Sequence, residues 1–142
     1  MQDSQANCGP VSVANALKSL GINRAVEELE TLLGTSATEG TSTLKMLRGL
    51  VKIDGLLVRL ITESRSEIAH LRLDAALRSG RPCVVCVDSG SHYVCAIGRL
   101  GTGRIIVADS ADTELVLSYT WEDFMQRWHE DGTKKPYWGV VL

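Results

Sequence analysis

The chain has 142 residues, of which 44% are hydrophobic, and 15 basic against 17 acidic side chains give a net charge of −2. This length suits one domain, residues 1–142, whose core needs no disulfide or metal staple. The charge balance argues against a nucleic-acid-binding surface. No apolar run reaches the ~18 residues of a membrane span, and no signal-peptide pattern opens the chain. The simplest localisation is therefore the cytoplasm.

The first half of the chain is predicted to be mostly helical, because apolar residues recur there at helical spacing. Glycines and capping residues mark where these helices end and begin. The expected helices are the segment from Cys8 to a stop at Gly21, AVEELETLL before Gly34, the segment after Thr41 or Ser42 that runs to Val51, and a weaker one from Ile68 or Leu73 to Ser79. A turn at residues 54–55 and a short strand, LLVRLI, separate the last two.

Beyond Pro82 the pattern changes to short strands, which are PCVVCVD, HYVCAIGRL, RIIVADS, TELVLSY and YWGVVL. The link SGS predicts a hairpin, and GTG joins the next two strands closely. Thr120 and Asp123 resemble a capping pair for one more helix, WEDFMQRW. Helices first and antiparallel strands after indicate an α+β fold.

Cys8 is the candidate nucleophile. It opens the first helix, and Pro10 fits the first turn of that helix, where no amide donor is needed. A thiol at a helix N-terminus lies near the positive end of the macrodipole and near free amide groups, which favour the nucleophilic thiolate. Asn7 fits the N-cap position, and Gly9 leaves room for a substrate backbone.

His92 and Asp109 are the candidate partners of this thiol. His92 begins a strand, so it can meet the helix that carries Cys8 across the cleft between the two halves of the chain. Asp109 ends the next strand, and the short GTG link predicts that the two strands are neighbours. A carboxylate there can orient the imidazole and stabilise its charged form, which completes a thiol–imidazole–carboxylate set.

Other cysteines and histidines are expected to be structural. Cys83 and Cys86 invite the hypothesis of a metal or redox pair, but RPCVVCV is typical of a buried strand, on which residues three apart face opposite sides. We therefore interpret both as small core residues and expect no metal site and no cofactor. His70 and His129 lie in polar segments and are expected to be exposed, without a chemical role.

The motifs Q-x5-C-G-P, then H-Y-V, then a strand that ends in aspartate resemble the bacteriocin-processing peptidase family. These papain-like cysteine peptidases cut double-glycine leader peptides and are commonly N-terminal domains of peptide-exporting transporters; stand-alone relatives with a similar CGP start match comparably well. The resemblance covers nearly the whole chain. It implies a papain-like α+β fold in which the helical N-terminal half packs on a mainly antiparallel C-terminal sheet.

The resemblance also implies a role for each site residue. The nucleophile of the family falls on Cys8, its base on His92, its imidazole-orienting aspartate on Asp109 and its oxyanion-hole glutamine on Gln2. The chain departs from the pattern after the aspartate, where the family often has proline and soon a glycine, whereas ADSADTEL follows here. This departure leaves Asp112 as a lesser candidate for the orienting carboxylate.

The implied activity is hydrolysis of a peptide bond by thiolate attack, on a peptide or protein substrate, with removal of a leader after a double-glycine site as its specific form. Two alternatives stay open. One is a catalytically inactive papain-like domain that binds a leader peptide; the other is a non-proteolytic acyltransferase or amidase on the same Cys-His-Asp site. Association with a peptide-export transporter rests on the resemblance alone, and the oligomeric state does not follow from the sequence.

Overall fold

The computed structural model describes residues 7–110, 116–129 and 134–142, and within these ranges it contains helices and strands in mixed order. The elements are α1 (Cys8–Ser19), α2 (Val26–Leu33), α3 (Thr43–Leu50), β1 (Arg59–Glu63), α4 (Ser66–Arg78), β2 (Cys83–Val87), β3 (His92–Leu100), β4 (Arg104–Asp109), β5 (Val116–Thr120), α5 (Trp121–Arg127) and β6 (Tyr137–Val141). No helix in the described ranges is long and apolar enough to cross a bilayer.

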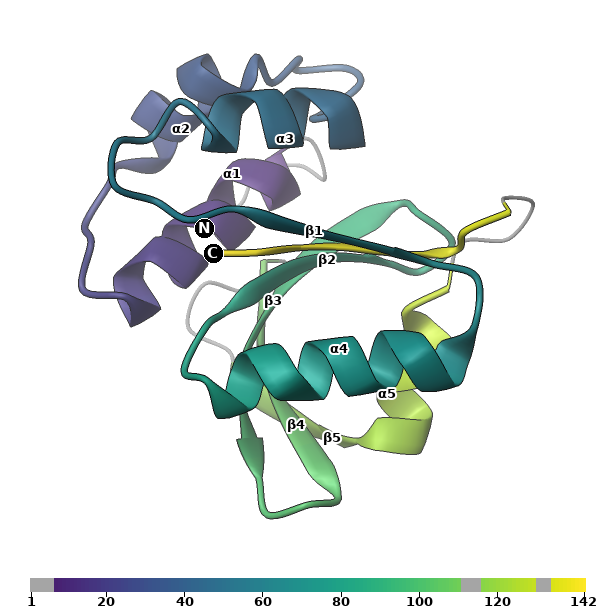
Figure 1. The fold of residues 1–142 in the computed structure, drawn as a ribbon. Helices are drawn as coiled ribbons and strands as arrows, with labels where there is room; N and C mark the ends of the chain where they lie inside the picture. Colours follow the sequence, from purple (N-terminus) through teal and green to yellow (C-terminus); the bar gives the residue numbers. More distant parts are fainter. Residues whose placement is uncertain (1–6, 111–115, 130–133) are drawn as a thin grey trace.

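The strands form a single six-stranded sheet in the order β1-β6-β2-β3-β4-β5, and neighbouring strands are antiparallel. The last strand of the chain, β6, lies between β1 and β2 (Figure 1). In register, Val87 pairs with His92 across β2 and β3, and Val94 pairs with Asp109 across β3 and β4. This register brings the start of β3 and the end of β4 to the same edge of the sheet.

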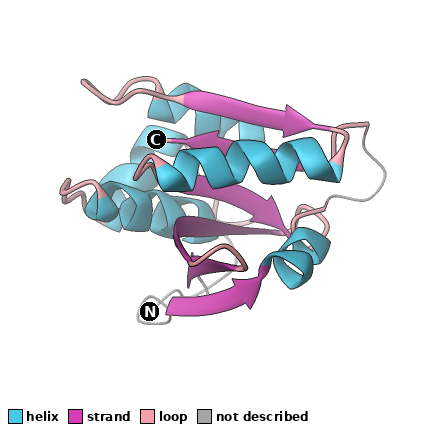
Figure 2. Ribbon diagram, turned by 60° about the horizontal axis from the view of Figure 1, so that its bottom comes forward, coloured by secondary structure: helices cyan, strands magenta, loops and turns pink. Residues whose placement is uncertain are grey.

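Helices cover both faces of the sheet. Helices α1, α2 and α3 lie on one side of it, and α4 and α5 lie on the other (Figures 1 and 2). Strand β2 is buried along its whole length because both of its faces are covered, which explains its unbroken apolar sequence. Its side chains alternate between the two cores, with Val84 and Cys86 under α1 and Cys83, Val85 and Val87 under α4.

The α+β prediction is confirmed, and so are two of the helix starts. The hydroxyl of Ser42 accepts a hydrogen bond from the backbone N–H of Lys45 at the start of α3, and that of Thr120 accepts one from Asp123 at the start of α5. Trp121, Phe124 and Trp128 of the α5 segment are buried, as core residues of that pattern should be.

Two predicted boundaries are wrong. Helix α4 begins at Ser66, before either predicted start. Ala69 extends its buried face by one turn, but the side chain of alanine is too small to mark that turn in the apolar pattern. Strand β1 begins only at Arg59, later than LLVRLI implied, since its pairing with β6 starts where Arg59 meets Val141. The helices also do not all pack on one face of the sheet as a single helical half, because α4 and α5 pack on the face opposite α1.

Candidate active site

Helix α1 positions Cys8 at its first residue, where the side chain is buried with only 6% of the residue exposed. The backbone N–H of Tyr93 in β3 donates a hydrogen bond to the Sγ atom of Cys8 at 3.4 Å. Asn7 does occupy the N-cap position, but its side chain makes no capping hydrogen bond. The start of α1 is therefore joined to the start of β3, 85 residues later in the chain.

The space where a side chain would stand at Gly9, next to Cys8, is taken by the protein itself. A Cβ atom added at Gly9 would lie 2.9 Å from the Oγ1 atom of Thr41 and 3.2 Å from the Cε atom of Met46. Thr41 is held in place because its Oγ1 lies 2.6 Å from that of Thr35 and its carbonyl accepts a hydrogen bond from the Tyr93 hydroxyl at 2.9 Å. Glycine is needed at position 9 for this close packing, and the interpretation that it leaves room for substrate is wrong.

His92 and Asp109 meet at the edge where β3 begins and β4 ends. The Nε2 atom of His92 lies 2.8 Å from Oδ1 of Asp109, and the two side chains are 12% and 13% exposed. A carboxylate only accepts hydrogen bonds, so Nε2 carries the proton in this pair. The other ring nitrogen, Nδ1, is thereby left for the thiol. The structure thus brings together three of the predicted residues: Cys8, His92 and Asp109.

The environment of His92 favours its charged form. The largest effect is a side-chain hydrogen bond with Cys8, which raises the pKa of His92 above its ordinary value. Burial of the ring opposes this rise, and the hydrogen bond and negative charge of Asp109 add to it. A raised pKa of the imidazole next to a cysteine favours a thiolate–imidazolium pair.

Ser110 is a site residue that the sequence analysis missed. It is fully buried, and its hydroxyl donates a hydrogen bond to the carbonyl of Tyr93 while its Oγ atom lies 3.5 Å from Nε2 of His92. Ser110 occupies the position after Asp109, where the chain departs from the expected proline. A serine after a strand is also typical of an ordinary turn, so the sequence carried no signal for this contact.

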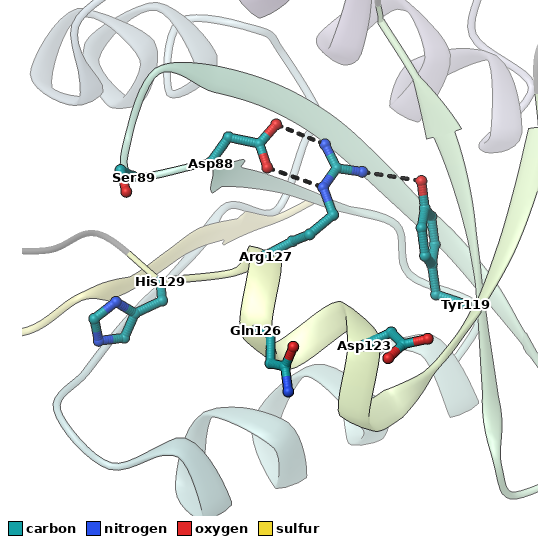
Figure 3. A pocket seen from close by; sticks show the side chains of 7 residues that line it. All are labelled: Asp88, Ser89, Tyr119, Asp123, Gln126, Arg127 and His129. Carbon is teal, nitrogen blue, oxygen red and sulfur yellow. Dashed lines mark hydrogen bonds and ion pairs between the residues drawn. The ribbon is translucent and has the colours of Figure 1, made fainter.

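Arg127, at the end of α5, is a second residue that was missed. Its guanidinium forms a bidentate hydrogen bond with the carboxylate of Asp88, at 3.0 and 2.8 Å (Figure 3). Its Nη1 atom lies 3.8 Å from Oδ2 of Asp109. A basic residue in the last turn of a helix is usually explained by the helix dipole, so sequence alone did not single it out. Arg127 and Asp88 also line a surface cavity of about 480 Å³.

A separate cavity of about 320 Å³ opens at the candidate nucleophile. Its lining combines Cys8 and the acidic Glu39 with mostly small or hydroxyl-bearing residues from two loops, the start of α3 and the sheet, namely Gly40, Thr41, Ser42, Thr43, Cys86, Gly90, Ser91 and Tyr93. Cys8 therefore borders a hollow that an extended chain could enter. The loop before α3 and the turn before β3 form its rims.

The other cysteines differ from Cys8 in their surroundings. Cys83 and Cys86 belong to different cores on opposite faces of β2, as predicted for strand residues three apart. Burial raises the pKa of the Cys83 thiol and that of the Cys95 thiol, so both are disfavoured as thiolates. Cys86 lines the same cavity as Cys8.

Two histidines are less exposed than expected. His70 stacks on Trp121 with ring centroids 4.1 Å apart, and His129 packs edge-on against Tyr137 at 5.6 Å. Both are half-buried because each ring covers an aromatic side chain on the α5 side of the sheet. Gln2, the predicted oxyanion-hole residue, and Asp112, the lesser candidate for the orienting carboxylate, lie outside the described residues.

Several solved structures share this fold. The peptidase domain of Streptococcus ComA, described as a bifunctional ABC transporter involved in a quorum-sensing pathway, aligns with a TM-score of 0.74 and 22% identity over 98% of this chain and 92% of that one. The corresponding domain of Streptococcus mutans ComA aligns with a TM-score of 0.64 and 16% identity, covering 99% and 95% of the two chains.

A third similar structure is the N-terminal peptidase C39-like domain of a toxin-secretion ATP-binding protein from Vibrio parahaemolyticus, with a TM-score of 0.58 and 14% identity over 99% of this chain and 96% of that one. At these identities the likeness establishes the fold. No curated protein matches the sequence. The Peptidase_C39 like family, however, matches residues 1–136, nearly the full length. The chain therefore belongs to the Peptidase_C39 like family.

Proposed function

We propose that this protein is a cysteine peptidase that hydrolyses a peptide bond by thiolate attack. One observation carries the proposal: Cys8, His92 and Asp109, from three separate elements, form a hydrogen-bonded series beside a cavity that Cys8 lines. Membership of a peptidase-like family supports the same activity. In this proposal Cys8 is the nucleophile, His92 the base and Asp109 the group that orients the imidazole.

The reaction begins with transfer of the Cys8 proton to Nδ1 of His92. The raised pKa of His92 supports this step, because an imidazole that prefers its charged form holds the proton while the sulfur stays anionic. The thiolate then attacks the carbonyl carbon of the scissile bond, and the carbonyl π electrons move to oxygen. Asp109 keeps Nε2 bonded throughout, so the ring cannot rotate away from the sulfur.

The negative charge that develops on the carbonyl oxygen needs hydrogen-bond donors. The backbone amide of Cys8, the first residue of α1, is the donor that we propose for this oxygen. The side chain of Gln2, which the family resemblance assigns to this role, would supply a second donor. One such donor contributes roughly 10²–10³ in rate.

The intermediate collapses when the C–N bond breaks and His92 gives its proton to the leaving amine. The carbonyl carbon is then bound to Cys8 as a thioester. A water molecule, deprotonated by His92, attacks this thioester; the carboxylic acid product leaves, and the thiol is restored. Every proton in this cycle passes through Nδ1 of His92.

The substrate that we propose is a leader peptide cut after a double-glycine site. The cavity at Cys8 is bordered by Gly40 and Gly90, and such a site suits a chain segment with small residues next to the cut. Helix α3 starts at the rim of this cavity with Thr43. Two large apolar side chains are exposed on this segment: Leu44 of α3 at 55% and Val51, the C-cap residue, at 62%. An amphipathic leader helix could pack there.

We further propose that the protein acts in the cytoplasm, in association with a peptide-exporting transporter. The similar structures include peptidase domains of ABC transporters, which supports such an association. All four cysteines are free thiols, which suits a reducing compartment and is required of a thiol nucleophile.

A paired substitution tests the activity. Peptides with and without a double-glycine site would be incubated with the wild type, with Cys8→Ala and with Cys83→Ala as the control, and products read by mass spectrometry. We expect cleavage by the wild type and by Cys83→Ala, whose sulfur lies in the opposite core, and none by Cys8→Ala. Cleavage by Cys8→Ala at the wild-type rate would contradict the proposal.

The same samples separate the alternatives. An inactive binding domain would retain the peptide without cleaving it, and its Cys8 would react with iodoacetamide no faster than the other three cysteines. An amidase or acyltransferase would label rapidly at Cys8 yet release ammonia or transfer the acyl group to an added amine. Rapid labelling of Cys8 with hydrolysis at a backbone amide is the result that the proposal requires.

A further inference from the structure

We propose that Arg127 is a positioning residue of this site, which holds both the segment before His92 and the carboxylate of Asp109 in the alignment that Cys8 requires. The inference rests on the proposed function, because it assigns Arg127 a part in the reactivity of Cys8. It adds a residue from α5, an element that supplies neither the nucleophile nor the base.

Arg127 holds the turn that leads into His92. Asp88 and Ser89 have φ angles of 55° and 58°, in the left-handed region that non-glycine residues seldom adopt. Such a turn persists only where surrounding contacts determine it. Arg127 supplies three of them, since both oxygens of the Asp88 carboxylate accept from its guanidinium and the Asp88 N–H donates to its carbonyl at 2.9 Å.

Arg127 also holds Asp109. Its Oδ1 atom is bonded to His92, and its Oδ2 atom lies 3.8 Å from Nη1 of Arg127. The same Nη1 donates to the hydroxyl of Tyr119 at 3.0 Å, which fixes the orientation of the guanidinium (Figure 3). Rotation of the Asp109 carboxylate would break the hydrogen bond from Oδ1 to His92 and the ion pair from Oδ2 to Arg127. Arg127 therefore favours the Asp109 rotamer that accepts the hydrogen bond from the imidazole.

The charges agree with this arrangement. The hydrogen bonds to Asp88 raise the pKa of Arg127, and those from Arg127 lower the pKa of Asp88, so both groups are ionised wherever the enzyme would work. Asp88 therefore offsets part of the positive charge of Arg127 near the His92 imidazole. Cys8 and Asp109 raise the pKa of His92, and the charge of His92 in turn lowers the pKa of Asp88.

The guanidinium matters by its shape as well as its charge. A planar fork can bond both oxygens of Asp88 while its remaining nitrogen faces Tyr119 and Asp109, whereas an ammonium group is a single point charge. We therefore expect the Arg127→Lys variant to keep part of the positioning effect of Arg127 and the Arg127→Met variant to keep none of it. A shift of about 1 Å in a catalytic group costs on the order of 10²-fold in rate, which sets the scale for Arg127→Met.

The experiment compares Arg127→Met and Arg127→Lys with a matched control, Arg99→Met. Arg99 also bonds a carboxylate, that of Asp74, at 2.8 Å, and its side chain is 28% exposed against 25% for Arg127. Three quantities would be measured for each: thermal unfolding, the rate of Cys8 alkylation by iodoacetamide as a function of pH, and kcat and KM on a cleaved peptide.

We expect both methionine variants to fold, with the larger loss of stability in Arg127→Met, because Asp74 keeps Arg78 as a partner when Arg99 is replaced, whereas Asp88 and Asp109 both lose the guanidinium of Arg127. Of the two methionine variants, only Arg127→Met should lower the alkylation rate and kcat, by about 10- to 100-fold. Its KM should stay within a factor of two or three of the wild-type value, and its pH profile of alkylation should be displaced. Arg127→Lys should fall between Arg127→Met and the wild type. A folded Arg127→Met with the alkylation profile and kcat of the wild type would overturn the inference.

Two further outcomes are informative. If Arg127→Met does not fold, Asp88→Asn takes its place, because it removes the partner of the fork and must also lower the alkylation rate if the inference holds. If the wild type itself shows no faster alkylation at Cys8 than at its other cysteines, the proposed function fails and the inference fails with it. The wild-type measurement therefore distinguishes the two failures.

Discussion

The two faces of the sheet differ in what they bury. The face under α1, α2 and α3 holds three of the four cysteines, Cys8, Cys86 and Cys95, together with the aromatic ring of Tyr93. The face under α4 and α5 holds an aromatic group, in which Phe124 and Trp128 are fully buried. One face therefore carries the candidate nucleophile, while the other resembles an ordinary hydrophobic core.

The candidate site lies where the two faces meet, at one end of β3 and β4. His92 and Asp109 occupy register positions of the same parity as Val94, whose side chain belongs to the α4 and α5 face. Because His92 is the first residue of β3, its ring can nevertheless bond Cys8 from the opposite layer. The layer under α1, α2 and α3 therefore supplies the sulfur, and the layer under α4 and α5 supplies the groups that hold the base.

The largest effect should follow from His92→Ala. Loss of the base should lower kcat/KM by about 10²–10⁴-fold, or roughly 3–5 kcal/mol. The matched control is His70→Ala, which removes a histidine that stacks on Trp121 in the other layer. Its turnover per folded molecule should equal that of the wild type, as measured by peptide cleavage at a temperature where both variants are folded. Equal losses in the two variants would show that this comparison of layers is mistaken.

A matched pair of core substitutions sharpens the comparison. Leu17 in α1 and Leu73 in α4 are both fully buried, one in each core. Leu17→Ala and Leu73→Ala should each lower the free energy of unfolding by about 2–5 kcal/mol in denaturant titrations. Only Leu17→Ala should also slow alkylation of Cys8 in the folded protein, because it disturbs the helix that carries the sulfur.

Two glycines offer a smaller version of the same test. A methyl group at Gly9 would meet Thr41 at 2.9 Å, and one at Gly139 would meet the Cys83 sulfur at 3.0 Å in the opposite core. Gly9→Ala and Gly139→Ala should each cost about 1–3 kcal/mol of stability. Gly9→Ala alone should change the rate of Cys8 alkylation. An unchanged rate in Gly9→Ala would mean that α1 tolerates movement against its neighbouring loop.

The smallest effect concerns the titration of His92, followed by NMR of its ring protons. Cys8 and Asp109 both raise the pKa of His92, so Cys8→Ala and Asp109→Asn should both lower it. The hydrogen bond with Cys8 is the larger cause, and Cys8→Ala should therefore produce the larger fall.

Local chemistry was enough to predict the candidate triad. Cys8 at a helix start, His92 at a strand start and Asp109 at the end of the next strand are features of short segments, and the GTG link predicted that the two strands are neighbours. The opposite facing of Cys83 and Cys86 followed from the twofold repeat of a strand. The assignments of Gln2 and Asp112 stay predictions.

The support of this site could not be predicted in the same way. Thr41, Ser110 and Arg127 each lie in a segment whose sequence is explained by an ordinary loop, turn or helix end. Their contacts join residues from different layers of the fold, such as Arg127 with Asp88, 39 positions apart.

The elements, the α+β class and the reactive residue types could be predicted from the sequence, because they depend on periodicity, capping and spacing over a few residues. Tertiary structure decided the insertion of β6 between β1 and β2, the division of helices between two faces and the arginine behind the triad. The physical reason is that these features depend on which surfaces, distant in the sequence, pack against one another. An apolar pattern along the chain shows that a face is buried but not which element covers it.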